Sequence, residues 1–318
     1  MKIVLLEPLR VAAESIEIFA KPLVEQGHQF ISYAERTVDV AELAKRTDDA
    51  DIVIVANTPY PKEAFQKAKN LKLINVAFTG TDHVDVAFAT ENAIKVANAS
   101  GYATQAVAEL SIGLTMAVYR SITQGDKDIR QANDFPGLIQ GKEIHGKTVG
   151  IVGLGEIGLA TAKLFKAFGA KVIAYNRSQQ QEALDLGIVY KELDDVLKES
   201  DIISIHLPLN DATKYLINAE KLALMKKSAI LINVARGPII DNQALADTLN
   251  DGLIAGAGID VFDNEPPLAS DYPLLNAKNI VLTPHIGYLT DEAMLLRAQI
   301  VFENVKAFIN NQPQNLVN

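Results

Sequence analysis

The chain lacks cysteine altogether, which excludes a disulfide framework, a thiolate nucleophile and a cysteine-ligated metal site. It also lacks an apolar run long enough to span a membrane, and the N-terminal stretch Met1–Leu6 turns polar too early for a signal peptide. Basic residues are the minority: 30 Lys and Arg against 39 Asp and Glu give a net charge of −9, which argues against a nucleic-acid surface. These absences predict a cytoplasmic protein with neither a membrane nor a nucleic-acid partner.

The composition that remains is globular, with 48% apolar and 22% charged residues over 318 positions, enough for two α/β domains. Short apolar β-type runs alternate with helical segments, a pattern typical of parallel sheets covered on both faces. The first series of predicted strands comprises Lys2–Leu6, Gln29–Tyr33, Asp51–Ala56, Leu73–Ala77 and Lys95–Ala97. The second comprises Thr148–Val152, Lys171–Tyr175, Asp201–His206, Ala229–Val234, Ala255–Val261 and Ile280–Thr283.

Three other segments organise the domains. A longer helix is predicted over Thr104–Arg120, and the polar stretch Asp134–Lys147 precedes the second series. The last helix, Asp291–Asn310, is amphipathic and is expected to pack back onto the first domain. We therefore predict an α/β protein with two doubly wound parallel-sheet domains: a smaller flavodoxin-like substrate domain (1–99 and 289–318) and a Rossmann dinucleotide-binding domain (100–288).

The clearest motif is the turn Gly153–Gly158, of sequence GLGEIG, which follows a predicted strand and opens a helix. Gly153 permits the tight turn, Gly155 lets the backbone approach a pyrophosphate, and Gly158 lets helix and strand pack closely. The helix N-terminus, with Glu156 and Ile157, then faces the anion. The turn predicts a bound nicotinamide dinucleotide, although a glycine turn without ligand is the structural alternative.

The next strand usually ends in an acidic residue that binds the adenosine ribose. Here it ends in Asn176, Arg177 and Ser178. An arginine pairs with a 2′-phosphate that a carboxylate would repel, so the replacement favours NADP(H). NAD(H) stays open as the alternative, with Arg177 projecting into water or stacking on the adenine.

Three ionisable residues follow strands of the second series: Arg236, Glu265 and His285. Open α/β sheets bind their ligands at such strand ends. These residues lie in the segments Asn233–Gly237, Asp260–Pro267 and Thr283–Gly287. Together with the glycine turn and the segment Val107–Leu110, these segments resemble the D-isomer-specific 2-hydroxyacid dehydrogenase family, in particular glyoxylate and hydroxypyruvate reductases. The resemblance spans nearly the whole chain.

The resemblance implies an NAD(P)-dependent oxidoreductase that reduces a small 2-oxo acid. His285 would be the general acid and base at the carbonyl oxygen. Glu265 would accept a hydrogen bond from the far ring nitrogen and fix the tautomer. Arg236 would hold the substrate carboxylate or carbonyl oxygen through its fork of donors. Taken singly, each residue has an ordinary structural interpretation: Arg236 as part of a surface ion pair, Glu265 as a solvated loop acid, and His285 as a histidine whose hydrogen bonds are made within the fold.

Other family positions map onto this chain with less weight. Phe78, Thr79 and Gly80 match a glycine loop whose N–H groups would hold the substrate carboxylate. Asp260 would contact the nicotinamide carboxamide. Further cofactor contacts are implied at Thr104, Val107, Pro208, Val234 and Ala235. Tyr102 and Tyr288 are expected either to shape a substrate pocket or to serve as packing.

No histidine has a partner at metal-ligand spacing, so no catalytic metal is expected. The resemblance also implies a homodimer built on residues 104–132. One alternative function of another class stays open, because corepressors of the C-terminal-binding-protein type resemble the same family. The chain would then be a dinucleotide-sensing interaction protein.

Overall fold

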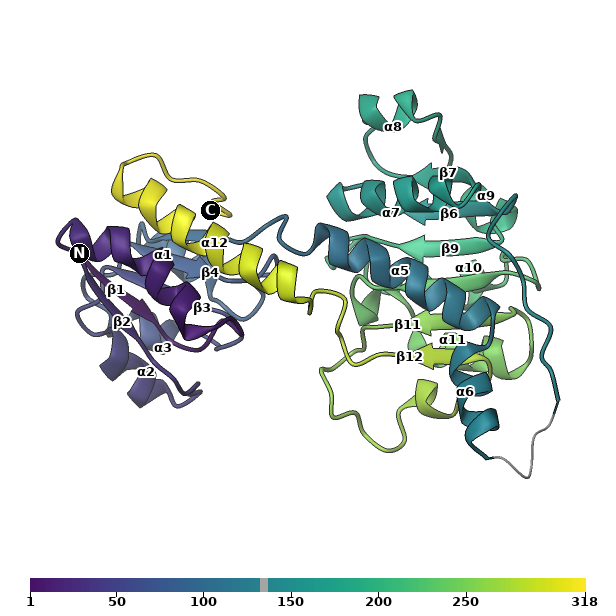
Figure 1. Cartoon of the computed structure of the whole chain (residues 1–318), viewed down its shortest axis with the longest axis horizontal. Coiled ribbons are helices and arrows are strands. Elements are labelled where there is room, and N and C mark those ends of the chain that lie inside the picture. Colours follow the sequence, from purple (N-terminus) through teal and green to yellow (C-terminus); the bar gives the residue numbers. More distant parts are fainter. Residues whose placement is uncertain (132–136) are drawn as a thin grey trace. The chain divides into compact units, whose positions relative to one another are not determined.

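A computed structural model describes residues 1–131 and 137–318 of the chain (Figure 1). The chain divides into two compact units, one formed by Met1–Ala103 with Leu289–Asn318 and the other by Thr104–Tyr288. Of the predicted polar stretch, residues 134–136 lie outside the described residues, as does Ala132 at the end of the segment expected to form a dimer.

The first unit is built on a five-stranded sheet in the order β2-β1-β3-β4-β5, with every pair of strands parallel. This is the strand order of flavodoxin-like folds, and the order reverses direction between β1 and β3. The strands are β1 (Lys2–Leu5), β2 (Gln29–Ser32), β3 (Ile52–Val55), β4 (Leu73–Val76) and β5 (Lys95–Asn98).

Helices cover both faces of this sheet because successive side chains of a buried strand point to opposite faces. One face, with Val4, Val53 and Ile74, packs on residues of helices from the first hundred positions. Figure 1 shows α1 and α12 side by side on the unit, where Phe19 and Phe302 have ring centroids 5.7 Å apart. The helices are α1 (Ala13–Glu25), α2 (Val40–Thr47), α3 (Lys62–Phe65), α4 (Val86–Glu91) and α12 (Asp291–Ile309).

The second unit is built on a seven-stranded parallel sheet in the order β12-β11-β10-β9-β6-β7-β8. Read from the other edge, the order begins β8-β7-β6-β9-β10-β11. If β6 is counted as strand 1, this is the dinucleotide-binding order 3-2-1-4-5-6, with the switch point between β6 and β9. The strands are β6 (Thr148–Val152), β7 (Lys171–Tyr175), β8 (Val189–Tyr190), β9 (Ile202–Ile205), β10 (Ile230–Asn233), β11 (Gly256–Ile259) and β12 (Ile280–Leu282).

Two layers of helices enclose the second sheet. One layer contributes the buried Leu197, Leu222 and Leu245 to the main core. On the other face α5 approaches closely, since a Cβ on Gly258 would lie 2.9 Å from the Leu114 Cβ. The helical segments are α5 (Thr104–Tyr119), α6 (Ile122–Arg130), α7 (Glu156–Ala167), α8 (Gln181–Asp185), α9 (Leu193–Glu199), α10 (Ala219–Leu222), η1 (Gly237–Ile239), α11 (Asn242–Asn250) and η2 (Pro273–Asn276).

Two details differ from the sequence expectation. The edge strand β8 is only two residues long, too short for its sequence to show an alternating pattern. The first unit also extends to Ala103 rather than to residue 99. The reason is local: Ala99 N donates to Phe78 O (3.0 Å) and the Tyr102 ring packs on the Phe78 ring, so this loop belongs with β4 and β5.

Candidate active site

The glycine turn follows β6, and each of its glycines has a separate reason. Gly153 has a φ of 95°, in the region that favours glycine, and a Cβ there would lie 2.8 Å from the His206 carbonyl carbon. A Cβ on Gly158 would lie 2.1 Å from Gly153 O, so only glycine lets α7 pack this closely on the turn. A Cβ on Gly155 would meet nothing within 4 Å, which leaves its outer side open to a ligand.

The start of α7 is suited to bind an anion. Gly155 precedes the helix without a side-chain cap. Among the described residues, the N–H groups of Gly155, Glu156 and Ile157 have no protein acceptor, as the first N–H groups of a helix commonly lack one. Orphan N–H groups together with the positive end of the helix dipole favour a phosphate at this place. The turn therefore fits a dinucleotide pyrophosphate.

The loop after β7 closes over the same turn. Asn176 Oδ1 accepts a hydrogen bond from Leu154 N (3.1 Å), and Asn176 Nδ2 donates to Ser178 O (2.7 Å). Both polar ends of the Asn176 amide thus hold the loop. Arg177 and Ser178 are exposed, and no ion pair within the described chain engages Arg177. The cation is therefore available at the end of β7.

Arg236 is positioned by a buried asparagine at the end of β10. Asn233 is fully buried; its Oδ1 accepts from Ala235 N (3.1 Å) and its Nδ2 donates to Arg236 O (3.0 Å). The half-buried Arg236 side chain donates from Nη1 to Ala235 O (2.8 Å). Sequence reasoning missed the role of Asn233, although an asparagine ending an apolar strand is a signal for such a backbone clamp.

His285 and Glu265 are brought into direct contact. His285 Nδ1 and Glu265 Oε1 lie 2.6 Å apart, while the Glu265 side chain is 72% exposed and that of His285 is 27% exposed. The carboxylate fixes the imidazole tautomer with the proton on Nδ1 when the ring is neutral, which leaves Nε2 for a reacting group. The Tyr288 ring stands edge-on to the His285 ring at 5.5 Å between centroids.

Asp260 binds the loop that carries His285. It is 1% exposed, and its carboxylate accepts hydrogen bonds from Thr283 Oγ1 (2.6 Å), Ile286 N (2.9 Å) and Gly287 N (2.8 Å). Burial raises the pKa of the Asp260 carboxyl, while these hydrogen bonds act to lower it. Both carboxylate oxygens therefore have protein partners within the second unit.

The remaining predicted cofactor residues lie on the same unit. Val234 and Ala235 follow β10, Pro208 follows β9 and is exposed, and Thr104 begins α5. Val107 is buried on α5, where its side chain faces Gly287. The strand-end residues lie at the carboxyl edge of one parallel sheet, the edge at which such sheets bind ligands.

The predicted substrate loop lies in the first unit, directly after β4. Phe78 is half-buried, and Thr79 is exposed. Phe78 O accepts from Ala99 N and Thr79 O accepts from Asn98 Nδ2 (2.8 Å), so two loop carbonyls are engaged. In the described part of the chain, the N–H groups of Thr79 and Gly80 have no protein acceptor. Such neighbouring N–H groups at a sheet edge are suited to bind an anion.

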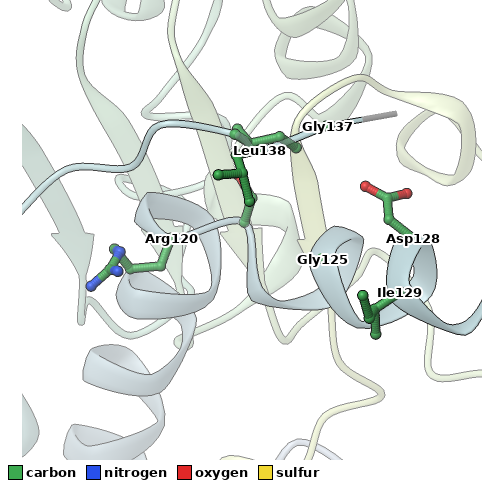
Figure 2. A pocket seen from close by; sticks show the side chains of 8 residues that line it. Arg120, Gly125, Asp128, Ile129, Gly137 and Leu138 are labelled. Carbon is green, nitrogen blue, oxygen red and sulfur yellow. The ribbon is translucent and has the colours of Figure 1, made fainter. Parts of the chain in front are cut away.

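Two pockets lie on the second unit. One, of about 280 Å³, is lined by residues of the loops that carry Glu265 and His285, among them Pro266, Thr283 and Pro284. The other lies between the end of α5, α6 and Leu138; Figure 2 shows Arg120, Asp128 and Ile129 around it. None of the predicted site residues is among the described residues that line this second pocket.

Over residues 1–131 and 137–318, no group of three or more His, Asp or Glu side chains could hold a metal ion. Over the same residues, no helix is both long and apolar enough to cross a membrane.

Comparison with known proteins identifies the family. The family model of the D-isomer specific 2-hydroxyacid dehydrogenase NAD binding domain matches residues 112–287. A glyoxylate reductase of Thermofilum pendens is 42% identical over 285 residues, which are 87% of this chain and 84% of the relative. A hydroxypyruvate reductase of Blautia hydrogenotrophica is 37% identical over 290 residues, 88% of each chain.

A solved structure agrees over the full length. An acyclic imino acid reductase in complex with NADPH and D-Arg superposes with a TM-score of 0.88 at 32% identity and covers 100% of both chains. The chain belongs to the D-isomer-specific 2-hydroxyacid dehydrogenase family and is an oxidoreductase with a Rossmann-type NAD(P)-binding domain.

Proposed function

We propose that this protein reduces a small 2-oxo acid, such as glyoxylate or hydroxypyruvate, to the D-2-hydroxy acid with NADPH as the favoured hydride donor. The observation that carries the proposal is the 2.6 Å contact between His285 Nδ1 and Glu265 Oε1, on loops that follow the strands of a dinucleotide-binding sheet. An oriented histidine with a free Nε2 is the proton donor that carbonyl reduction requires.

His285 and Glu265 divide the proton chemistry. The reduced nicotinamide supplies a hydride to the carbonyl carbon when the cofactor is bound. Protonated His285 gives its Nε2 proton to the carbonyl oxygen as negative charge develops there, and it takes the proton back in the oxidation. Glu265 holds the ring by Nδ1, which keeps Nε2 free for the carbonyl oxygen.

The substrate's anionic end is held by cations and N–H groups. Arg236 binds the carboxylate or the carbonyl oxygen with a planar fork of donors, and Asn233 fixes the backbone on which that fork stands. The loop Phe78–Gly80 binds the carboxylate through its N–H groups. Asp260 is assigned the nicotinamide carboxamide, in addition to its observed hydrogen bonds to the loop of His285.

The cofactor preference rests on the end of β7. No acidic residue stands there, and the exposed Arg177 offers a cation for a 2′-phosphate. The comparisons leave the choice between NADPH and NADH open. The family model describes an NAD binding domain, whereas the imino acid reductase structure contains NADPH. Within the proposed assignment the second unit binds the dinucleotide and supplies Arg236 and His285, and the first unit supplies the loop Phe78–Gly80.

A panel of 2-oxo acids, each assayed with NADPH and with NADH, tests the proposal. We expect turnover of glyoxylate or hydroxypyruvate and a higher kcat/KM for NADPH than for NADH. A clear preference for NADH would overturn the cofactor assignment. Tight NADPH binding without turnover of any 2-oxo acid would overturn the substrate assignment; the relatives found give no support to a dinucleotide-sensing corepressor. Addition of ammonium to the panel checks reduction of 2-imino acids, which the imino acid reductase neighbour makes a specific alternative.

A further inference from the structure

Arg297, on α12, is removed from water in the first unit. It is 1% exposed and is among the largest fully buried side chains of the described chain. Arginine is seldom buried to this extent, because a guanidinium withdrawn from water needs compensating contacts. One such contact is a hydrogen bond from Arg297 Nη2 to Leu9 O (2.6 Å).

The buried charge lies directly behind the predicted substrate loop. The guanidinium carbon of Arg297 stands over the Phe78 ring at 4.6 Å from its centroid, and over the Tyr102 ring at 6.0 Å. The two rings pack on each other with centroids 6.1 Å apart. The first residue of the loop that presents N–H groups to an anion is therefore stacked on a cation.

Hydrogen bonds hold the loop so that it presents N–H groups, whose partial charge is positive like that of the guanidinium. Asn98 Nδ2 donates to Thr79 O, and Asn98 O in turn accepts from Asn304 Nδ2 (2.8 Å) of α12. With the Thr79 carbonyl engaged, the N–H groups of Thr79 and Gly80 supply the partial positive charge. The N–H groups and the guanidinium both favour a negative ligand at the carboxyl edge of β4.

We propose that Arg297 is an electrostatic positioning residue: its fixed positive charge behind Phe78 strengthens the binding of the substrate carboxylate to the loop Phe78–Gly80. The inference rests on the proposed function. Arg297 is buried, so it acts on the substrate through space and does not touch it. Because the intervening medium is protein, the attraction is screened less by salt than one between exposed charges.

The test compares variants that keep or remove the charge. Arg297→Lys keeps a cation on α12, and Arg297→Gln removes it while retaining an N–H donor for Leu9 O. The readout is the dissociation constant of oxamate, a non-reducible anionic analogue of a 2-oxo acid, measured by calorimetry on the enzyme with reduced cofactor. At an effective dielectric constant of about 20, loss of a unit charge about 12 Å from the anion weakens binding by roughly tenfold.

Arg46→Gln is the matched control. Arg46 is also a stacked arginine of the first unit, with its guanidinium 4.2 Å from the Tyr33 ring centroid and its side chain 12% exposed. Tyr33 follows β2, three strand spacings from β4, which is about 14 Å across the sheet. The control therefore removes the same charge and a similar stacking contact away from the substrate loop.

We expect Arg297→Gln to weaken oxamate binding by roughly tenfold and to raise the KM of the 2-oxo acid similarly, with NADPH binding and kcat within about twofold of the wild type. Arg297→Lys is expected to restore most of the oxamate affinity, and Arg46→Gln to leave it unchanged. Equal losses in the Lys and Gln variants would show that Arg297 only shapes the core, and would overturn the inference.

Three further outcomes are decisive. If Arg297→Gln does not fold, the Lys variant carries the test, because a folded Lys variant with a tenfold loss of oxamate affinity contradicts a role for the charge. If the wild type neither binds oxamate nor reduces any 2-oxo acid, the proposed function fails. If the wild type does both and Arg297→Gln matches it, only the inference about Arg297 fails.

Discussion

His285 has a backbone conformation that non-glycine residues rarely adopt, with a φ of 53°. Its N–H lies within hydrogen-bond distance of both Asp260 O (2.8 Å) and Thr283 O (3.0 Å), and this holds the conformation in place. A left-handed residue of this kind persists only where surrounding contacts fix it, and such residues are frequent at active sites. The backbone at the end of the sheet thus sets the direction of the His285 side chain, and the contact with Glu265 fixes the rotation of its imidazole ring.

The proposed proton-donor role of His285 predicts the effect of its replacement. We expect His285→Ala to lower kcat by at least roughly 100-fold, because the carbonyl oxygen loses its proton donor. The dissociation constant of NADPH, measured by fluorescence, should change by less than about threefold, since the phosphate turn is untouched.

A control separates chemistry from damage to the fold. His28→Ala removes another histidine, one whose Nδ1 lies 3.1 Å from the N-terminal amine in the first unit, and should leave kcat unchanged. Near-normal turnover of the His285→Ala variant would refute the acid–base role of His285.

At the scale of elements, the active-site loops depend on close backbone packing after β10 and β11. A Cβ on Gly237, at the start of η1, would lie 2.0 Å from the Phe262 carbonyl carbon and 2.1 Å from its oxygen. Phe262 lies on the loop that leads to Glu265, so this packing fixes Arg236 and Glu265 relative to each other. Only glycine permits it.

We therefore expect Gly237→Ala to lower both stability and activity. The added methyl group meets backbone atoms, so the free energy of unfolding should fall by about 1–3 kcal/mol, and kcat/KM should fall because the Arg236 and Glu265 loops separate. Thermal unfolding and steady-state kinetics measure the two effects.

Gly113→Ala is the matched control for this substitution. Gly113 lies within α5, and a Cβ there would meet nothing within 4 Å. Its replacement should leave activity unchanged and raise stability by up to about 1 kcal/mol through helix propensity. A Gly237→Ala variant that is as stable and as active as Gly113→Ala would contradict the packing argument.

At the scale of the whole molecule, exposed apolar side chains bear on assembly. Ile122 and Ile129 on α6 are 52% and 66% exposed, and Leu138 and Ile139 are 95% and 55% exposed. Apolar groups gathered on one segment commonly mark an interface. They lie within or just beyond the segment, residues 104–132, through which we predict a homodimer.

Light scattering after size exclusion tests this prediction. The wild type is expected at twice the chain mass of 34.5 kDa. Ile129→Glu should shift it toward the monomer, because a carboxylate buried in an apolar interface is costly. Ile18→Glu is the control, since Ile18 on α1 is equally exposed at 67% but lies outside the segment. A monomeric wild type would refute the prediction.

The sequence by itself determined both sheets, apart from the two-residue β8, and the family, because strand periodicity, the glycine turn and the order of Arg236, Glu265 and His285 are local properties of the chain. It also indicated the strand ends at which ligands bind. These features follow from side-chain alternation and from turns that only glycine can form.

Only the tertiary structure decided which side chains hold the site in place. The roles of Asn233, Thr283 and Arg297 arise from buried hydrogen bonds or ring contacts, such as those of Arg297 with the distant Leu9 and Phe78. The contact between His285 and Glu265, 20 positions apart, likewise needs β11 and β12 to pair. Such partners depend on long-range packing, which the local pattern of a sequence does not specify.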